Sequence, residues 1–487
     1  KVQLYMPKEK WIAKLHEYGA FKIKKDENGK DLWLYGTDFE KDEPRPAIDI
    51  PNTTALTGSN TYFCANGIIG ADRSLQPSIY EVKKGYQYII TSDVNLEKGE
   101  FEVRNKMLFT DVSDYKCVWK IEAEGKEIQM GELDIEVAPL TTKKIKIDYD
   151  VENLPEKECV LTVSFLKKDA EIWCDSDYEL SWNQFVIKER SKPKFKKSKE
   201  LLNLEKTAKG AVVKGSAFSV EIKDGRVVSY KHKGKEILVQ PMEPNYFRAL
   251  TDNDIDFLNF VVPLIKLHPL YKWRAATNSV KMLKTEVEQT GNYVEIRCAM
   301  SVPFISKVFT TYRVYNDGRL YVNHSGVPNF EMLRFGYKMA FDKSFDNVKW
   351  YGRGPQEIYC DRKRGAKIGE YQSDVKGLEH RYMRPQENGN RTDVRNVSFT
   401  DDNGFGVKFT AYYDKTIDFS AHNYTTDELE KFTHVHEIEY KDFNYVTIDM
   451  CQRGVGGDMP GFSCLREPYI IHAGEKLSYC FLMEIVE

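Results

Sequence analysis

The sequence predicts an all-β protein. Alternating apolar residues mark the strands: Val294, Ile296, Cys298, Met300 and Val302 share one face, with polar or small residues between them. Turn residues recur at short intervals from about residue 85 to the end of the chain. Aromatic residues make up 13% of the sequence, which suits facing sheets that need bulky inward side chains.

The sequence predicts two β-hairpins from its strand–turn–strand patterns. Residues 309–315 alternate, residues 316–319 (Asn-Asp-Gly-Arg) form a turn, and the apolar run 320–322 returns. A second hairpin runs from residues 117–123 through Glu-Gly-Lys to residues 128–130. Helical periodicity is confined to short stretches such as residues 8–18.

The chain divides into four segments. Residues 1–77 form an N-terminal segment, and residues 78–187 have the length of one immunoglobulin-like β-sandwich. Residues 188–210 are rich in lysine with little apolar periodicity, which predicts a solvated linker. Residues 211–487 then suit one large β-sandwich, because no second linker interrupts them.

Composition excludes several classes of partner. The 487 residues carry a net charge of only −3, which gives no electrostatic basis for binding nucleic acid. No apolar run approaches the roughly 18 residues of a membrane span, so no membrane partner is expected. The nine cysteines form no CxxC pair and several alternate with apolar residues, which favours reduced thiols in a cytoplasmic protein.

The most informative stretch is residues 62–73, Tyr-Phe-Cys-Ala-Asn-Gly-Ile-Ile-Gly-Ala-Asp-Arg. Its Asn-Gly step permits a sharp backbone turn, because both residues tolerate positive φ. Pro77 follows and suits the first turn of a short helix that carries Glu81 and Lys84 three residues apart.

As a string, residues 62–84 closely resemble the segment that leaves the last barrel strand in the β-galactosidases of glycoside hydrolase family 2. Other stretches resemble the same family; they lie at residues 26–39, 182–185, 247–254, 350–357, 384–389 and 454–458. On these matches, which span roughly residues 20–487, the chain is identified as a member of that family.

The resemblance implies an architecture. It predicts an immunoglobulin-like β-sandwich followed by a large galactose-mutarotase-like β-supersandwich, with a short remnant of a (β/α)8 barrel in residues 1–77. It also implies an oligomer.

The resemblance further implies a sugar site. In the family, the positions of Phe63 and Asn66 border the galactose pocket, and the Phe carbonyl and Asn amide oxygens bind sodium. Glu387 is expected beside the sugar site. Phe462 is expected near the position where well-known members carry a tryptophan that stacks on the sugar.

The family's catalytic glutamate pair and magnesium site lie on barrel strands upstream of Phe63, and nothing in residues 1–60 resembles them. The chain is therefore expected to be a non-catalytic half or subunit of a β-galactosidase-type hydrolase. It would act on β-galactosides such as lactose together with a catalytic barrel domain or subunit. Two alternatives stay open: a stand-alone carbohydrate-binding or scaffold protein, and a sugar epimerase.

One charged motif, Glu357 with Asp361, has a structural interpretation. Glu357 and Asp361 lie four residues apart in a strand-like context, about 14 Å, which is too far for a glycosidase pair. A salt bridge with Arg353, Arg362 or Arg364 is favoured.

Two other motifs look like metal sites but are better explained otherwise. Asp252 and Asp254 resemble the start of a calcium loop, yet no bidentate Glu follows at the right offset, so turn hydrogen bonding is favoured. His434 and His436 are expected on one strand face as histidines without a metal, because no third ligand is near.

Overall fold

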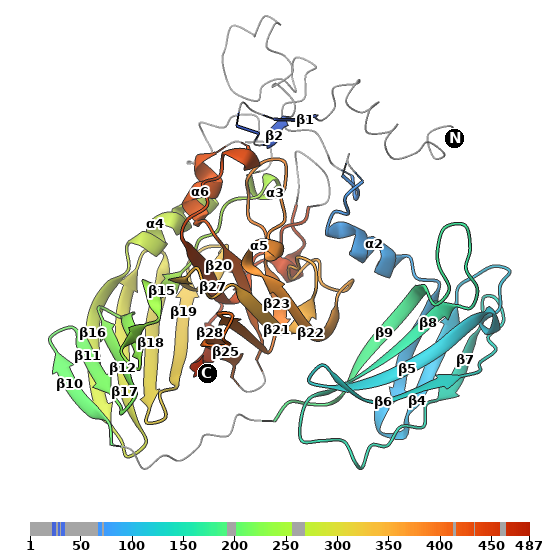
Figure 1. Cartoon of the computed structure of the whole chain (residues 1–487), viewed down its shortest axis with the longest axis horizontal. Helices are drawn as coiled ribbons and strands as arrows, with labels where there is room; N and C mark the ends of the chain where they lie inside the picture. The colour runs from blue at the N-terminus through green and yellow to red at the C-terminus, as the bar shows by residue number, and fades with distance from the viewer. Residues whose placement is uncertain are drawn as a thin grey trace, which may run out of the picture.

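The computed structural model describes residues 22–25, 28–29, 31–34, 67–70, 73–191, 201–255, 268–412, 415–432, 434–457 and 464–487. Within these ranges the chain folds into a smaller and a larger β-sandwich that lie side by side (Figure 1). Neighbouring strands pair antiparallel in both. The predicted all-β fold with an immunoglobulin-like domain ahead of a large sandwich is confirmed.

The smaller sandwich has a three-stranded and a four-stranded sheet. The first has the order β3 (Ile89–Asn95), β4 (Glu100–Asn105), β7 (Thr142–Lys146). The second has the order β6 (Lys126–Leu133), β5 (Tyr115–Ala123), β8 (Cys159–Lys167), β9 (Glu179–Lys188). Its core contains Phe101, Trp119, Ile121, Leu161 and Phe165, so alternate residues of β5 point inward as the sequence predicts.

The larger sandwich faces a ten-stranded sheet against a nine-stranded sheet. The first comprises β10 (Asn203–Thr207), β11 (Gly210–Lys214), β12 (Phe218–Lys223), β13 (Arg226–His232), β15 (Leu238–Asn245), β20 (Arg334–Asp342), β27 (Phe443–Gln452), β26 (Ile417–His422) and β23 (Arg391–Val394), with β14 (Lys235–Glu236) beside β13. The second comprises β16 (Lys281–Gln289), β17 (Tyr293–Val302), β18 (Ile305–Tyr315), β19 (Leu320–Pro328), β28 (Leu477–Val486), β25 (Gly406–Ala411), β24 (Asn396–Thr400), β21 (Asn347–Gly354) and β22 (Lys367–Asp374).

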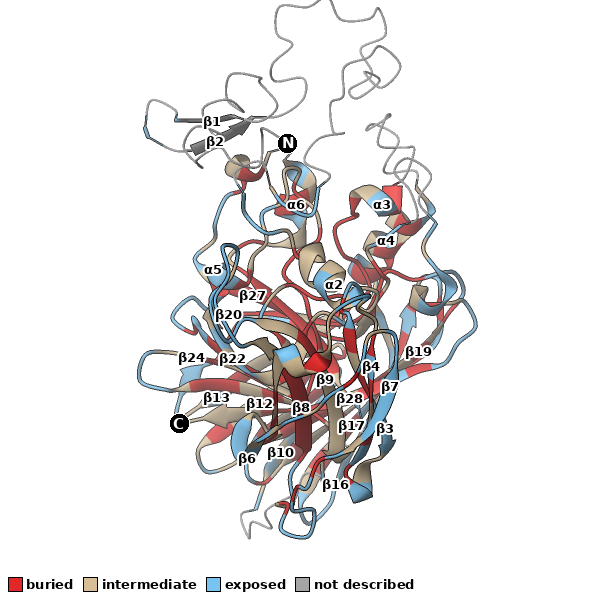
Figure 2. Cartoon of the chain, turned by 90° about the vertical axis from the view of Figure 1, so that its right-hand side faces the viewer, coloured by how far each residue is buried: buried red, intermediate tan, exposed pale blue. Residues whose placement is uncertain are grey.

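Buried residues concentrate between these two sheets (Figure 2). The predicted strand at residues 294–302 is β17, and its apolar positions are all buried. The predicted hairpin at 309–322 joins β18 to β19 through a turn in which Gly318 has a φ of +88°. The last strand, β28, lies between β19 and β25, so the C-terminal residues complete the middle of the sheet.

Within the described ranges, helices are few and short. They are α2 (Ser78–Gly85), α3 (Asp252–Ile255), α4 (Lys272–Asn278), α5 (Val375–Leu378) and α6 (Thr426–Lys431). Single 3-10 turns occur at Leu96–Lys98, Val112–Asp114, Pro269–Tyr271, Val435–Glu437 and Glu467–Tyr469. Helix α2 begins directly after Pro77, as the sequence predicts. The described part of the chain holds no helix with the length and apolar character needed to cross a bilayer.

Little of the predicted barrel remnant is described. Strands β1 (Lys22–Lys25) and β2 (Asp31–Leu34) pair as an antiparallel hairpin around Asn28 and Gly29. Most of residues 1–77, including the periodic stretch at 8–18, lies outside the described residues.

The predicted linker at 188–210 is shorter in the structure. Strand β10 already starts at Asn203, because Leu202 and Leu204 pack against the core of the large sandwich. At the other end, the Arg190 guanidinium donates to the backbone carbonyl of Ala411 (3.2 Å), which ties this residue to the large sandwich.

The two sandwiches meet along β8, β9 and β22. Val160 and Val186 pack on Tyr351 and Ile368. The Gln184 side chain exchanges two hydrogen bonds with the Ile368 backbone, at 2.7 and 3.0 Å.

Helix α2 reinforces this contact. Glu81 Oε1 accepts a 2.7 Å hydrogen bond from the Gly365 N–H, and a Cβ at Gly365 would lie 2.5 Å from the Tyr80 backbone. Lys84 Nζ lies 3.9 Å from the centre of the Trp182 ring. The helix is therefore fixed to both sandwiches.

A buried ion pair completes the interface. Arg395 donates to both Glu158 oxygens at 2.8–3.2 Å, and both side chains are nearly inaccessible. Arg395 also donates to the Asp393 carbonyl (2.7 Å). The bidentate geometry fixes the orientation of one domain on the other.

Replacing Glu158 by alanine is expected to destabilise the chain by about 3–5 kcal/mol, because Arg395 would stay buried without its counter-charge. The urea unfolding midpoint measures this. The double variant Glu158→Leu/Arg395→Met should recover most of the loss. Asp148→Ala, which removes an exposed pair with Lys146, should leave the midpoint unchanged. A Glu158→Ala midpoint equal to that of the native chain would contradict this assignment.

Candidate functional site

Three stretches that carry the family resemblance meet at one end of the large sandwich. They are the segment after β15, the segment before β23, and residues 453–457 after β27. The Asp252 N–H donates to Gln386 Oε1 (3.1 Å), and Gln386 Nε2 donates back to Asp252 Oδ2 (3.0 Å). Asn253 Nδ2 donates to the Val455 carbonyl (2.7 Å). Residues about 130 and 200 positions apart in sequence are thus held in one surface.

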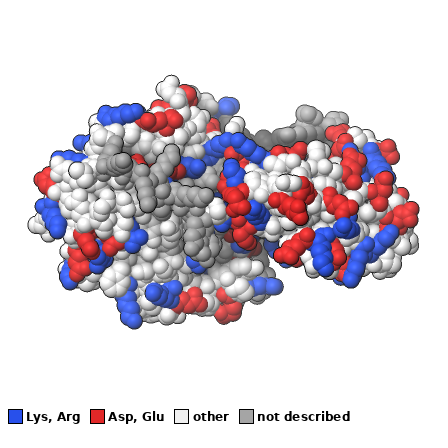
Figure 3. Space-filling model, turned by 90° about the horizontal axis from the view of Figure 1, so that it is seen from below, with Lys and Arg blue, Asp and Glu red and all other residues white. Residues whose placement is uncertain are grey.

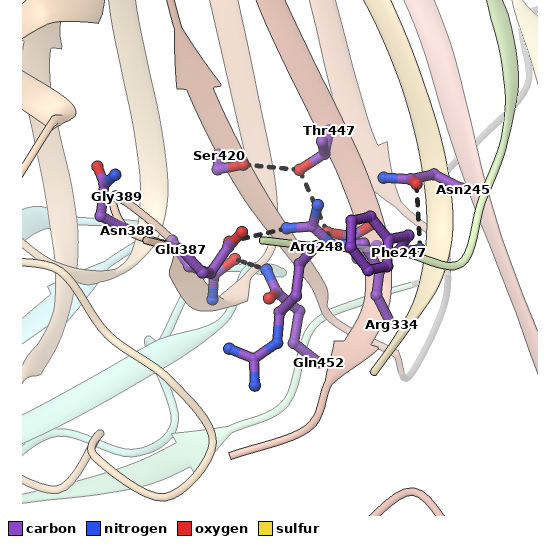
Figure 4. Close-up of polar contacts among 12 residues, drawn as sticks. Asn245, Phe247, Arg248, Arg334, Glu387, Asn388, Gly389, Ser420, Thr447 and Gln452 are labelled. Carbon is purple, nitrogen blue, oxygen red and sulfur yellow. Dashed lines mark hydrogen bonds and ion pairs between the residues drawn. The ribbon is translucent and has the colours of Figure 1, made fainter. Parts of the chain in front are cut away.

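An arginine lies behind this surface at the start of β20. Arg334 donates to Glu387 Oε1 at 3.0 Å, and its Nε lies 3.2 Å from Asp449 Oδ2 (Figure 4). Gly336 is the register partner of Asp449, and a Cβ at Gly336 would overlap Asp449 Oδ1. Glycine is therefore required there for the carboxylate to reach the arginine.

A second buried ion pair supports the first segment. Arg248 is fully buried and donates to Asp254 Oδ1 (3.1 Å) and to the Gly454 carbonyl (3.2 Å). Asp254 Oδ2 also accepts from the Thr251 N–H (2.9 Å), which closes the turn that becomes α3. The turn role favoured for Asp254 is thus confirmed.

A third cluster orders the Glu387-Asn388-Gly389 turn from below. Glu357 pairs with Arg362 and accepts from Tyr382 OH (2.5 Å) and from the Gly389 N–H (2.7 Å). The predicted salt bridge for Glu357 is therefore confirmed.

The turn itself requires glycine. Gly389 has a φ of +77°, and a Cβ there would lie 2.7 Å from His422 Nε2. His422 Nε2 lies 3.1 Å from Asn388 Oδ1, and burial lowers the pKa of His422 to about 3, so its ring is neutral and donates this bond.

Some buried polar atoms behind this surface have no hydrogen-bond partner within the described residues. They are Arg248 Nε and Nη1, Tyr359 OH and Gln452 Oε1. Gln452 uses its other atom, Nε2, to donate to Asn390 Oδ1 (2.9 Å). Buried polar side chains and a small apolar cluster therefore lie together at this end of the sandwich, unlike the aromatic core between the sheets.

The structure describes one of the four predicted sugar-site residues. Glu387 is only 5% exposed and is paired with Arg334, so it holds its turn in place from behind the surface. Phe63, Asn66 and Phe462 lie outside the described residues, and with them the predicted sodium ligands. No group of three or more His, Cys, Asp or Glu side chains that could hold a metal occurs in the described ranges.

The prediction that His434 and His436 share a strand face is wrong. The chain forms a 3-10 turn at Val435–Glu437, because Glu437 Oε2 accepts from the His434 N–H (3.0 Å) and closes the turn. The carboxylate of Asp361, the other member of the Glu357 motif, accepts a hydrogen bond from the Gly456 N–H (2.7 Å).

Sequence reasoning did not single out Arg334, Asp418 or Asp449. All three lie at buried strand positions. The available signal was a charged residue inside a strand that is otherwise apolar, because such a residue must find a buried partner.

Asp418 and Asp449 lie directly opposite each other on β26 and β27. Burial raises the pKa of Asp418 to about 7. Burial also raises the pKa of Asp449 to about 8, although Arg334 acts in the opposite direction. Burial therefore favours the protonated form of the Asp418 carboxyl near neutral pH, whereas the Arg334 guanidinium opposes protonation of Asp449.

Comparisons with known proteins match both sandwiches. A profile of the family described as "Beta galactosidase small chain" matches residues 213–483, and one described as "Beta-galactosidase, domain 4" matches residues 101–188. A β-galactosidase of Priestia megaterium is 31% identical over 469 residues, which cover 94% of this chain and 43% of the relative. A β-galactosidase of Halalkalibacterium halodurans is 29% identical, covering 94% of this chain and 44% of the relative. The chain spans less than half the length of these relatives.

Solved structures give a weaker likeness. A galactose mutarotase-related enzyme of Lactobacillus acidophilus is 12% identical, with a TM-score of 0.29, and the match covers 58% of this chain and 97% of that one. A TM-score at this level supports no conclusion.

The aspartate pair predicts a pH dependence. A carboxyl whose pKa is raised on folding stabilises the native state most below its unfolded pKa, and this contribution is lost as the pH rises toward the folded value. Asp418→Asn should therefore gain stability relative to the native chain between pH 5 and 8.5, on the order of 2 kcal/mol.

Thermal unfolding at both pH values measures this difference. Asp442→Asn, at an exposed position, is the control and should show no such trend. A variant whose relative stability falls as the pH rises would contradict the assignment.

Proposed function

The chain belongs to the β-galactosidase small-chain family, and we propose that it is the non-catalytic half or a subunit of a β-galactosidase-type glycoside hydrolase. In this role it supplies one edge of the sugar pocket and the scaffold domains. A catalytic barrel domain or subunit supplies the reacting carboxyl groups. The proposed substrates are β-galactosides such as lactose.

The observation that carries the proposal is the extent of the match. Both sandwiches match β-galactosidase profiles in one chain, at residues 101–188 and 213–483. The same chain covers only 43% of the Priestia megaterium relative. We propose that the catalytic part corresponds to the portion of the relative that this chain does not match.

The site chemistry agrees with this division of labour. A retaining glycosidase uses two carboxyl groups roughly 5–5.5 Å apart, one as nucleophile and one as acid and base. At the end of the large sandwich described above, Glu387, Asp254 and Glu357 are each buried and each paired with an arginine. Groups held in this way position loops and do not face a sugar.

The proposed sugar contacts are Phe63, Asn66 and Phe462, with Glu387 holding the turn beside them. Sodium is proposed at the Phe63 carbonyl and the Asn66 amide oxygen, since this cation prefers neutral and anionic oxygen ligands. Magnesium is proposed only for the complete enzyme, on ligands of the catalytic part.

Two further properties are proposed with this function. The eight described cysteines are all free, which supports a cytoplasmic location. An oligomer is proposed on the family resemblance.

The chain alone is expected to show negligible hydrolysis of an aryl β-galactoside, because the reacting carboxyl pair is supplied by the partner. Addition of the catalytic part should restore turnover. A preparation of verified mass, assayed by release of the aryl alcohol, makes this test. Turnover by the chain alone above the buffer rate would overturn the proposal. Galactoside binding without any effect of the catalytic part would favour a stand-alone binding protein.

Asn66→Ala should weaken galactoside binding in the complemented enzyme by roughly 1–3 kcal/mol, because a buried polar contact is lost. KM measured against sodium concentration reports both roles. Replacing the Phe63 side chain should keep the sodium dependence, since the carbonyl remains. Asn403→Ala, at an exposed turn, is the control. If Asn66→Ala lowers only thermal stability, the residue is simply a turn former.

A further inference from the structure

One end of the smaller sandwich exposes an unusual set of large apolar side chains. They come from three places in the sequence: the end of α2, the β4–β5 loop and the β8–β9 loop. Phe109 is 93% exposed, Ile172 fully exposed and Trp173 57% exposed. The apolar end surface, as we name it, comprises Tyr86, Tyr88, Leu108, Phe109, Ile172 and Trp173.

Hydrogen bonds between the loops hold these side chains at the same end. The Lys106 N–H donates to the Tyr88 carbonyl (2.8 Å), which ties the β4–β5 loop to the segment after α2. Lys168 Nζ donates to the Ser113 carbonyl (2.6 Å), which ties the β4–β5 loop to the β8–β9 loop. Lys83 Nζ of α2 lies 4.4 Å from the centre of the Tyr178 ring in the β8–β9 loop.

The pair Ile172 and Trp173 is held in place by local contacts. Glu171 and Cys174 exchange backbone hydrogen bonds at 2.8 and 3.2 Å, so Ile172 and Trp173 form the tip of a two-residue turn. Trp173 Nε1 donates to Glu171 Oε2 (2.8 Å), and its ring meets Tyr178 edge-on at 5.6 Å. An aromatic side chain fixed before binding loses little conformational entropy on binding, which is typical of the residues that dominate interfaces.

The large sandwich does not cover this end. It contacts the outer faces of β8 and β9, the Glu158–Arg395 pair, Glu179 at the start of β9 and Glu81 of α2. None of these contacts involves the exposed side chains of the apolar end surface. Contiguous exposed apolar surface on a folded domain marks an interaction site. The faces visible from below, in contrast, carry intermixed acidic and basic side chains (Figure 3).

The position of α2 indicates what covers the surface. Helix α2 follows residues 73–77, which continue the segment that resembles the exit from the last barrel strand (Figure 1). It ends at Gly85, next to Tyr86 of the apolar end surface. A barrel joined through that segment would lie beside this end of the sandwich. More than half of each relative's length lies outside the match, which in those relatives leaves length for a large further domain.

We propose that the apolar end surface is the docking face for the catalytic barrel of the β-galactosidase-type enzyme. Ile172 and Trp173 insert as the central anchors, and Phe109 and Leu108 extend the contact. This proposal rests on the proposed function, and it adds the surface through which the two parts assemble.

The test uses the full chain and, as the partner, the part of the Priestia megaterium β-galactosidase that this chain does not match, after a thermal transition has shown that this part is folded. The double variant Phe109→Ser/Trp173→Ser should raise the dissociation constant at least tenfold, measured by biolayer interferometry. Its own melting temperature should stay at the native value, because both side chains are exposed. The matched control is Phe309→Ser on β18, which removes an exposed aromatic far from this surface and should change the constant less than twofold.

Failure of the docking face and failure of the proposed function give different results. Binding by the double variant equal to that of the native chain would overturn the docking face and leave the proposed function standing. A native chain that neither binds the partner nor restores its activity would overturn both. Sedimentation that reveals a dimer of this chain, abolished by the double variant while partner binding persists, would assign the surface to a second copy and overturn the proposal.

Discussion

The buried guanidinium of Arg334 is the constraint on which the site end of the large sandwich depends. It sits at the start of β20 and pairs with Glu387 from the 384–391 segment and with Asp449 from β27. A charge taken out of water is tolerated only where partners surround it, and the loss of one partner leaves the others uncompensated. Strand pairing, turn position and charge balance are therefore set together, and Gly336 is required so that Asp449 can reach the pair.

For Glu387, this constraint separates two possible roles: direct contact with the sugar and positioning of the turn beside the sugar site. A buried carboxylate with one oxygen paired to an arginine is a poor direct ligand for a sugar, because it would first have to leave a buried ion pair. It is a good determinant of loop position, because its geometry admits little variation. The same holds for Asp254 with Arg248 and for Glu357 with Arg362. The described part of this edge is thus a rigid frame, built for side chains that project from neighbouring positions.

The sequence predicted most of the fold because alternation is a direct consequence of strand geometry. Strand β17 and the β18–β19 hairpin follow from the pattern alone. The pattern could not reveal that β28 enters between β19 and β25, since pairing partners are chosen by packing. The sequence pattern also did not reveal β10, which lies in a lysine-rich stretch. This edge strand attaches to the core through Leu202 and Leu204 alone, so it shows little apolar alternation. For His434 and His436, one local hydrogen bond from the His434 N–H to the Glu437 carboxylate outweighed the strand-like spacing.

The site was less predictable for a related reason. Glycine turns and polar runs are visible locally, so the segments that meet at this edge could be named. The groups that join them, Arg334 and Asp449, look ordinary until the sheet places them inside. Their informative property is burial, and a charged residue in an apolar strand is the only local sign of it. The same logic applies in reverse to Trp173, whose apolar side chain is informative because the fold leaves it outside. In both places the informative observation is a side chain in an environment that does not suit it: a charged group in the interior, or a large apolar group in water. A buried charge is stabilised by an ion pair within the fold, whereas an exposed apolar side chain marks a surface for a partner.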